Sequence, residues 1–168
     1  MIYKITGKQP NTRMCFVCGL KNEFGLKVPF YETESNEIIS LFKPSDEHQG
    51  YPGRLHGGIA SAILDETIGR AINIGKENEI WAVTVEINIK YKKPVPVNEE
   101  IKVIGRVINE NKRLFHGTGE IILANGETAV TAEGKYLILP IDKIADFDRD
   151  YNDWRVVKSA SDPYTIEI

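Results

Sequence analysis

The sequence contains little of what marks secreted, membrane-spanning or nucleic-acid-binding proteins. Only two of its 168 residues are cysteine, which implies no disulfide framework, so a cytoplasmic protein is expected. No apolar run approaches the roughly 18 residues that a membrane span needs, and residues 1–14 lack the apolar core of a signal peptide. A net charge of −3 provides no basic face for nucleic acid. We therefore expect neither nucleic acid nor a membrane as a partner.

The composition is that of an ordinary globular domain. Apolar residues make up 42% and charged residues 27% of a chain that is long enough for one sizeable core. Residues 1–24 are rich in turn formers and are expected to form an N-terminal arm with a C-x-x-C turn. Residues 25–141 are expected to form the folded domain. Residues 142–168 form a tail of mixed charge, which the pattern does not place.

One segment has the pattern of a long helix, about residues 57–74. Apolar side chains cover nearly all of its circumference, which is typical of a buried helix, and Gly75 follows as a plausible stop. Two strands are expected before it, at 26–32 and 36–45. The apolar residues of the helix are Ile59, Ala60, Ala62, Ile63, Leu64, Ile68, Ala71 and Ile72.

After the helix the apolar pattern changes to a period of two. Residues 82–94 alternate as a long half-buried strand, and residues 100–140 provide three more strands with turns at "NENKR" and "ANGE". A single buried helix needs a curved antiparallel sheet wrapped around it. The order of elements therefore predicts an α+β fold rather than a parallel α/β fold.

The helix begins at His56-Gly57-Gly58, which is suited to binding a developing negative charge. A helix N-terminus presents unpaired N–H groups and the positive end of its dipole, and glycine lets a ligand approach the backbone. A tight turn without further function is the alternative for the two glycines. Beside such a turn, His56 is expected to hydrogen-bond the loop more often than to act as a base.

Two adjacent acids, Asp65 and Glu66, lie in the apolar middle of the helix. Glu66 has Arg70 four residues later, the favourable spacing for a helical ion pair, so it is expected to be a paired and solvated side chain. Asp65 has no cation at that spacing, and a buried carboxylate is costly unless it is paired. Asp65 is therefore the candidate for chemistry, with a structural bond to Ser61 or to a backbone amide as the alternative.

Three stretches together resemble the hotdog-fold acyl-CoA thioesterases related to the phenylacetate-pathway (PaaI-type) enzymes. They are "GYPGRLHGGIASAILDE", "VTVEINIKYKKPVPV" and "IKVIGRVINENKRLFHGTGEI", and "CFVCGLKNEFGLKV" is similar to a segment that precedes the domain in one branch. The likeness covers about residues 15–140. It implies a hotdog fold, hydrolysis of an acyl-CoA without a metal or other cofactor, and a homo-oligomer, either a dimer or a tetramer.

The resemblance also implies roles for individual residues. Gly57 would provide the N–H that polarises the thioester carbonyl, with Gly58 beside it at the substrate. Asp65 would be the general base or nucleophile, and Thr84 would orient the water; an ordinary strand threonine is the alternative. His56 is retained as a further catalytic candidate.

Contacts with the substrate's coenzyme A are harder to assign. Relatives often have an asparagine six residues before the histidine; this chain has Gly50 there, and Gln49 is the candidate substitute. The phosphates would need cations through charge-assisted bonds, although surface cations are commonly only solvated. The candidates are Arg54, Lys92, Lys93 and Arg113.

Cys15 and Cys18 form a C-x-x-C pair whose role is open. A structural zinc site normally takes four ligands, and one pair per chain would have to be shared between chains. A redox pair would want thioredoxin-like surroundings, which the sequence lacks. A structural turn is the favoured interpretation, and no metal is expected.

Two further functions and one structural consequence complete the expectations. The alternatives are an acyl-CoA-binding hotdog without catalysis, and a hotdog hydratase or dehydratase that would use His56 with Asp65. Gly57 and Asp65 are eight residues apart, which is roughly 12 Å along a straight helix. We therefore expect Gly57 of one subunit to meet Asp65 and Thr84 of another, unless a bent helix start joins them within one chain.

Overall fold

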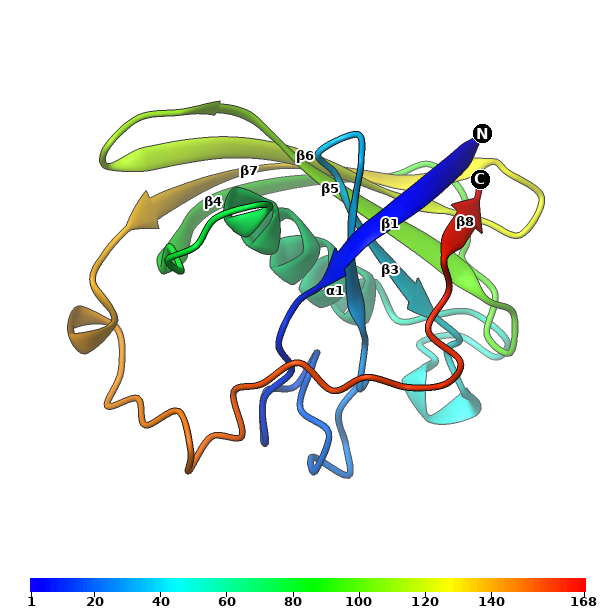
Figure 1. The fold of residues 1–168 in the computed structure, drawn as a ribbon. Helices are drawn as coiled ribbons and strands as arrows, with labels where there is room; N and C mark the ends of the chain where they lie inside the picture. The colour runs from blue at the N-terminus through cyan, green and yellow to red at the C-terminus, as the bar shows by residue number, and fades with distance from the viewer.

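The computed structural model describes all 168 residues as one antiparallel sheet curved around a single long helix (Figure 1). The eight strands lie in the order β4-β7-β6-β5-β3-β2-β1-β8. The predicted α+β fold and its antiparallel sheet are thus confirmed. The strands are β1 (Ile2–Lys8), β2 (Phe30–Thr33), β3 (Ile38–Phe42), β4 (Ala82–Tyr91), β5 (Ile101–Glu110), β6 (Leu114–Ile122), β7 (Thr128–Ile138) and β8 (Thr165–Glu167).

The helix α1 (Gly57–Arg70) continues as a short 3-10 turn, Ala71–Asn73, close to the expected length. One side of α1 is in the core, where it covers the inner face of the sheet. The other side, with Ser61 and Asp65, is only half-buried and lies along β4. The expectation of burial on all sides is therefore wrong for the single chain, because the edge of the sheet stops at β4. The buried side consists of Ala60, Ile63, Leu64, Thr67 and Ile68. The helix is also too short and too polar to cross a bilayer.

Glycines on β5 and β6 let the helix lie directly against the sheet. A Cβ on Gly117 would be 2.4 Å from Cγ2 of Ile68, and one on Gly105 would be 2.6 Å from the main-chain oxygen of Thr67. Real Cβ atoms do not approach so closely, so any side chain at these positions would push α1 away. These glycines therefore fix the distance between the helix and the sheet.

The expected N-terminal arm contributes a strand that the sequence analysis missed. β1 pairs with β2, and β8 from the tail pairs with β1. The alternation of apolar and polar residues in 2–8 is short, and turn-forming residues follow it directly. The pattern therefore does not indicate a strand there. The tail also packs on the domain through Trp154, whose ring lies 5.1 Å from that of Trp81.

Strand β4 forms one edge of the sheet. It pairs only with β7, so its other edge has no partner within the chain. The side chains of Val85 and Tyr91 on this strand are each 54% exposed. An unpaired edge with exposed apolar side chains is a surface on which a second strand can pair.

Candidate active site

The carboxylate of Asp65 is held by two hydroxyl groups from the sheet. Thr84 Oγ1 on β4 donates to Asp65 Oδ1 at 2.8 Å, and the hydroxyl of Tyr136 on β7 lies 3.1 Å from the same oxygen. The Tyr136 hydroxyl is also 3.1 Å from the main-chain oxygen of Asp65. Asp65 and Thr84, two of the expected site residues, are therefore brought into direct contact. Neither hydroxyl bonds Oδ2.

Tyr136 is a site residue that the sequence analysis missed. It is 71 positions from Asp65, and no motif marks it. Its ring stacks on Phe115 at a centroid distance of 4.7 Å, and it fits because Gly134 has no side chain: a Cβ there would be 2.6 Å from the ring. Burial, together with the charge of Asp65, raises the pKa of Tyr136. The hydroxyl therefore stays protonated and able to donate at neutral pH.

Glu66 forms the ion pair that its spacing predicts. Nε and Nη2 of Arg70 donate to Glu66 Oε1 at 2.9 and 2.8 Å. Contrary to the expectation, the pair is not solvated, because the N-terminal segment and the tail cover it. Arg70 is buried, donates to the main-chain oxygen of Pro10 and lies over the ring of Phe30. Glu66 and Asp65 thus face different surroundings.

At the start of α1, one N–H group is free and its neighbours are occupied. The N–H of Gly58 donates to Nδ1 of His56 at 2.9 Å, so His56 caps the helix, while the N–H of Gly57 has no acceptor within the chain. Ser61 donates to the main-chain oxygen of Gly57 and lies 2.7 Å from the hydroxyl of Tyr91. The alternative in which Ser61 bonds Asp65 is therefore wrong.

The helix start and the acid lie beside opposite ends of β4. Gly57 contacts Tyr91, the last residue of the strand, and Asp65 contacts Thr84 near its first residue. Thr84 and Tyr91 are seven residues apart on the extended strand, which is roughly 23 Å, while Gly57 and Asp65 are roughly 12 Å apart along the helix. The helix begins regularly at Gly57, so no bent helix start brings the two groups together within one chain.

The candidate phosphate-binding cations lie in two groups, one at each end of β4. Lys92 and Lys93 follow Tyr91, and Arg54 bridges to Pro96 nearby. Arg113 lies at the opposite end. It precedes Leu114 of β6, which pairs with Leu137 of β7, and Leu137 also pairs with Val83 near the start of β4. Lys93 forms an ion pair with Glu127.

In the loop before the helix, Oε1 of Gln49 accepts the N–H of Gly53 at 3.0 Å, so this side chain supports the loop.

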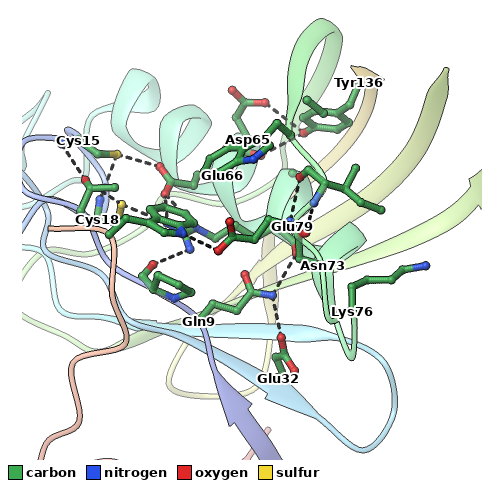
Figure 2. Close-up of a pocket in the computed structure, with 18 of the residues that line it drawn as sticks. Gln9, Cys15, Cys18, Glu32, Asp65, Glu66, Asn73, Lys76, Glu79 and Tyr136 are labelled. Atoms are coloured by element: carbon green, nitrogen blue, oxygen red, sulfur yellow. Dashed lines mark hydrogen bonds and ion pairs between the residues drawn. The ribbon is translucent and has the colours of Figure 1, made fainter. Parts of the chain in front are cut away.

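A cavity of about 490 Å³ adjoins the acid (Figure 2). Asp65, Thr84 and Tyr136 line one part of it, and the N-terminal segment, the segment from the end of α1 to the start of β4, and Trp154 of the tail line other parts. Figure 2 shows Asp65 and Tyr136 together on one side, with Cys15, Cys18 and Glu66 gathered on another. Both cysteines are free thiols, and Cys15 Sγ donates to Glu66 Oε2 at 3.1 Å.

Comparison with known proteins finds similarity to thioesterases, in sequence and in structure. Residues 52–130 match the family model of the thioesterase superfamily. Over 99 residues the chain is 35% identical to acyl-coenzyme A thioesterase THEM4 of Mus musculus, a match that covers 58% of this chain and 40% of that protein. It is 26% identical to acyl-coenzyme A thioesterase 13 of Mus musculus, covering 66% of this chain and 77% of that protein.

Solved structures share the fold. The PaaI protein of the E. coli phenylacetic acid degradation operon superposes with a TM-score of 0.62 at 16% identity, covering 68% of this chain and 81% of that one. A thioesterase protein of Streptococcus pneumoniae, solved with coenzyme A, has a TM-score of 0.56 at 18% identity, covering 61% of this chain and 78% of that one. Such identities show the fold alone. The chain spans two fifths of the length of the THEM4 relative that it matches.

Proposed function

We propose that this chain, whose sheet curves around one helix and whose residues 52–130 match the thioesterase superfamily model, is a hotdog-fold thioesterase that hydrolyses acyl-CoA thioesters to a free acid and coenzyme A. The observation that carries the proposal is the carboxylate of Asp65, held by Thr84 and Tyr136 at the wall of a cavity. A general base needs a fixed position beside its water and a free oxygen to take the proton. Asp65 has both, since Oδ2 accepts from neither hydroxyl.

The proposed reaction uses water as the nucleophile. Thr84 donates its proton to Asp65 Oδ1, so its oxygen lone pairs remain to accept a hydrogen bond from the water and orient it. Asp65 takes a proton as the water oxygen bonds to the thioester carbon. The carbonyl oxygen then carries the negative charge, which the free N–H at the start of a helix stabilises. Breakage of the carbon–sulfur bond releases the thiolate, which receives the proton.

The oxyanion donor in this proposal comes from the partner subunit. Within one chain Gly57 and Asp65 lie at opposite ends of β4, and the free edge of β4 allows two copies to pair antiparallel about a two-fold axis. Such pairing brings Tyr91 and Gly57 of the partner subunit next to Thr84 and Asp65. It forms two equivalent sites, and a pair of such dimers would form a tetramer.

The same pairing joins the cations that are separated in one chain. Lys92, Lys93 and Arg54 lie at the Gly57 end, and Arg113 lies at the Thr84 end. In a dimer, the cations of one subunit would face Arg113 of the other across the site. We propose that this arrangement holds the phosphates of coenzyme A, while the acyl group enters the cavity beside Asp65.

The two alternative functions have weaker support. A hydratase would need His56 with Asp65, but Nδ1 of His56 accepts the N–H of Gly58 and is therefore occupied in capping the helix. A sensor without catalysis would have no need for a carboxylate aligned by two hydroxyls. The cytoplasmic location expected from the sequence stays a prediction.

A panel of acyl-CoA substrates, assayed with a thiol-detecting dye, separates these functions. We expect release of one thiol per substrate, with a preference for acyl groups that fit a cavity of about 490 Å³. Tight binding of an acyl-CoA without thiol release would favour the sensor. Formation of a hydrated or dehydrated acyl-CoA with the thioester intact would favour the hydratase and contradict the proposal.

A further inference from the structure

Three metal-ligating atoms gather on the side of the cavity away from Asp65, and the proposed hydrolysis uses none of them. They are Sγ of Cys15, Sγ of Cys18 and a carboxylate oxygen of Glu66, all within 4.8 Å of one another. The two cysteines belong to the N-terminal segment, and Glu66 belongs to α1 (Figure 2). The third ligand thus comes from the same chain, 48 residues after the cysteine pair, so no sharing between chains is needed.

From this cluster we propose that Cys15, Cys18 and Glu66 bind one thiophilic divalent cation, foremost Zn²⁺, which fastens the N-terminal segment to α1. Tetrahedral Zn²⁺ with bonds of about 2.3 Å to sulfur and 2.0 Å to oxygen separates its ligand atoms by roughly 3.5–3.8 Å. The Cys15 Sγ to Glu66 Oε2 distance is 3.1 Å, and no pair exceeds 4.8 Å. Shifts of about 1 Å or less, within the reach of side-chain rotation, therefore produce the geometry.

The groups around the three ligands suit thiolate and carboxylate ligation. The N–H of Cys18 donates to Cys15 Sγ at 3.4 Å, and Nη2 of Arg70 donates to Cys18 Sγ at 3.1 Å. Arg70 also holds Oε1 of Glu66, which leaves Oε2 turned toward the thiols. Such outer hydrogen bonds orient the ligands of metal sites and stabilise their charge.

Arg70 does not exclude the cation, because the ligands match its charge. The negative charge of Glu66 balances the positive charge of Arg70. The two cysteines would bind as thiolates, with any thiol protons passing to solvent, so the two positive charges of the metal are matched. Two thiolates, one carboxylate, one guanidinium and one Zn²⁺ sum to zero. The buried site would therefore carry no net charge.

The fourth coordination position opens onto the cavity, because all three ligands line its wall. A water molecule there would complete the tetrahedron, as in zinc sites with three protein ligands. The cation would sit on the helix face of Glu66, and Asp65 would keep its contacts with Thr84 and Tyr136. The cation would hold the N-terminal segment to α1 through three protein ligands, one fewer than the usual structural zinc site, and this inference stands whether or not the chain hydrolyses thioesters.

Cobalt titration of the reduced protein tests the proposal. After anaerobic reduction and removal of metal, two thiols per chain should react with a thiol reagent. Co²⁺ should then produce thiolate-to-metal absorption in the near ultraviolet that saturates at one ion per chain, and Zn²⁺ should displace it. The variants Cys15→Ser, Cys18→Ser and Glu66→Gln should each bind Co²⁺ at least tenfold more weakly. The control Glu77→Gln, an exposed acid at the same cavity, should bind it normally.

Several outcomes overturn the inference, and none of them depends on enzymatic activity. The site is absent if reduced wild-type protein, with both thiols accounted for, produces no thiolate absorption with Co²⁺. Equal affinity in wild type and Glu66→Gln removes Glu66 from the ligand set. Equal affinity in wild type and Cys15→Ser shows that the ion binds elsewhere.

Discussion

Two neighbouring carboxylates on α1 face different surroundings, and the roles proposed for them differ accordingly. Asp65 points to the hydroxyls of Thr84 and Tyr136 beside the cavity, whereas Glu66 turns to Arg70 under the N-terminal segment. A rotation of about 100° per residue on a helix is enough to separate them. The assignment of chemistry to Asp65 follows from these contacts.

Exchange of each carboxylate for its amide tests this division. Asp65→Asn should lower kcat by about 10²–10⁴-fold, the usual contribution of a general base, with an unchanged melting temperature. Glu66→Gln should leave kcat of the folded enzyme close to wild type. It should lower the free energy of unfolding by about 3 kcal/mol, because buried Arg70 loses its charge partner. A larger loss of kcat in Glu66→Gln than in Asp65→Asn would reverse the assignment.

Tyr136 is proposed as a positioning residue for Asp65. Tyr136→Phe keeps the ring that stacks on Phe115 and removes only the hydroxyl. We expect kcat to fall about tenfold, in line with the roughly 1.5 kcal/mol of a hydrogen bond to a charged group, while KM and the melting temperature change little. A purely structural role would instead lower the melting temperature and leave kcat unchanged.

The sequence predicts part of this site and misses part of it for clear physical reasons. The Asp65–Thr84 contact and the Glu66–Arg70 pair follow from local spacing and from the family resemblance. Tyr136 comes from a strand that the fold brings in from 71 residues away, and no local pattern reports such a contact. The burial of Arg70 depends likewise on the N-terminal segment and the tail, which the pattern did not place.

At the scale of elements, the contact between α1 and β6 determines where the acid lies. A Cβ on Gly117 would clash with Cγ2 of Ile68 at 2.4 Å and with the main-chain oxygen of Arg106 at 2.9 Å. The helix therefore approaches the sheet as closely as a glycine allows. Any added volume at this contact would move the helix that carries Asp65.

Gly117→Ala should destabilise the protein by about 1–3 kcal/mol through overpacking, measured by denaturant unfolding. Gly7→Ala is the matched control in another strand, since its Cβ would meet only the Glu32 side chain, whose flexible end is the nearest part at 3.0 Å. We expect the control to change stability much less. Equal stability of Gly117→Ala and wild type would show that α1 does not rest on this glycine.

The sequence predicts the elements with strong periodicity, and also the short strands β2 and β3, but misses the two strands at the ends of the chain. Helix α1 and the four strands from β4 to β7 repeat their apolar residues over nine or more positions, long enough for the period to be recognised. β1 has seven residues and β8 only three, and they are strands because each finds a partner at the other end of the chain. Such long-range pairing leaves no local signal.

At the scale of the whole molecule, the proposed site is complete only in a dimer. One chain holds the base beside Thr84 and the free N–H beside Tyr91, at opposite ends of an unpaired edge strand. Antiparallel pairing of two β4 strands is the simplest way to join the two groups. The same pairing would cover Val85 and Tyr91, which are exposed in the single chain.

The variants for a decisive test fit the structure. Gly57 is the first residue of α1, where proline is tolerated, and His56 before it has the extended conformation that a following proline requires. Gly57→Pro therefore removes the free N–H without breaking the helix. Asp65→Asn removes the base and keeps the shape of the side chain. Each variant should form an inactive homodimer.

Activity of mixed dimers, each with one Gly57→Pro chain and one Asp65→Asn chain, tests the shared site most directly. With shared sites, one of the two sites carries both defects and the other carries neither, so about half of the wild-type activity per dimer should return. If each site lay within one chain, every site would keep one defect. Mixed dimers that remain inactive, with their assembly confirmed by mass, would contradict the account.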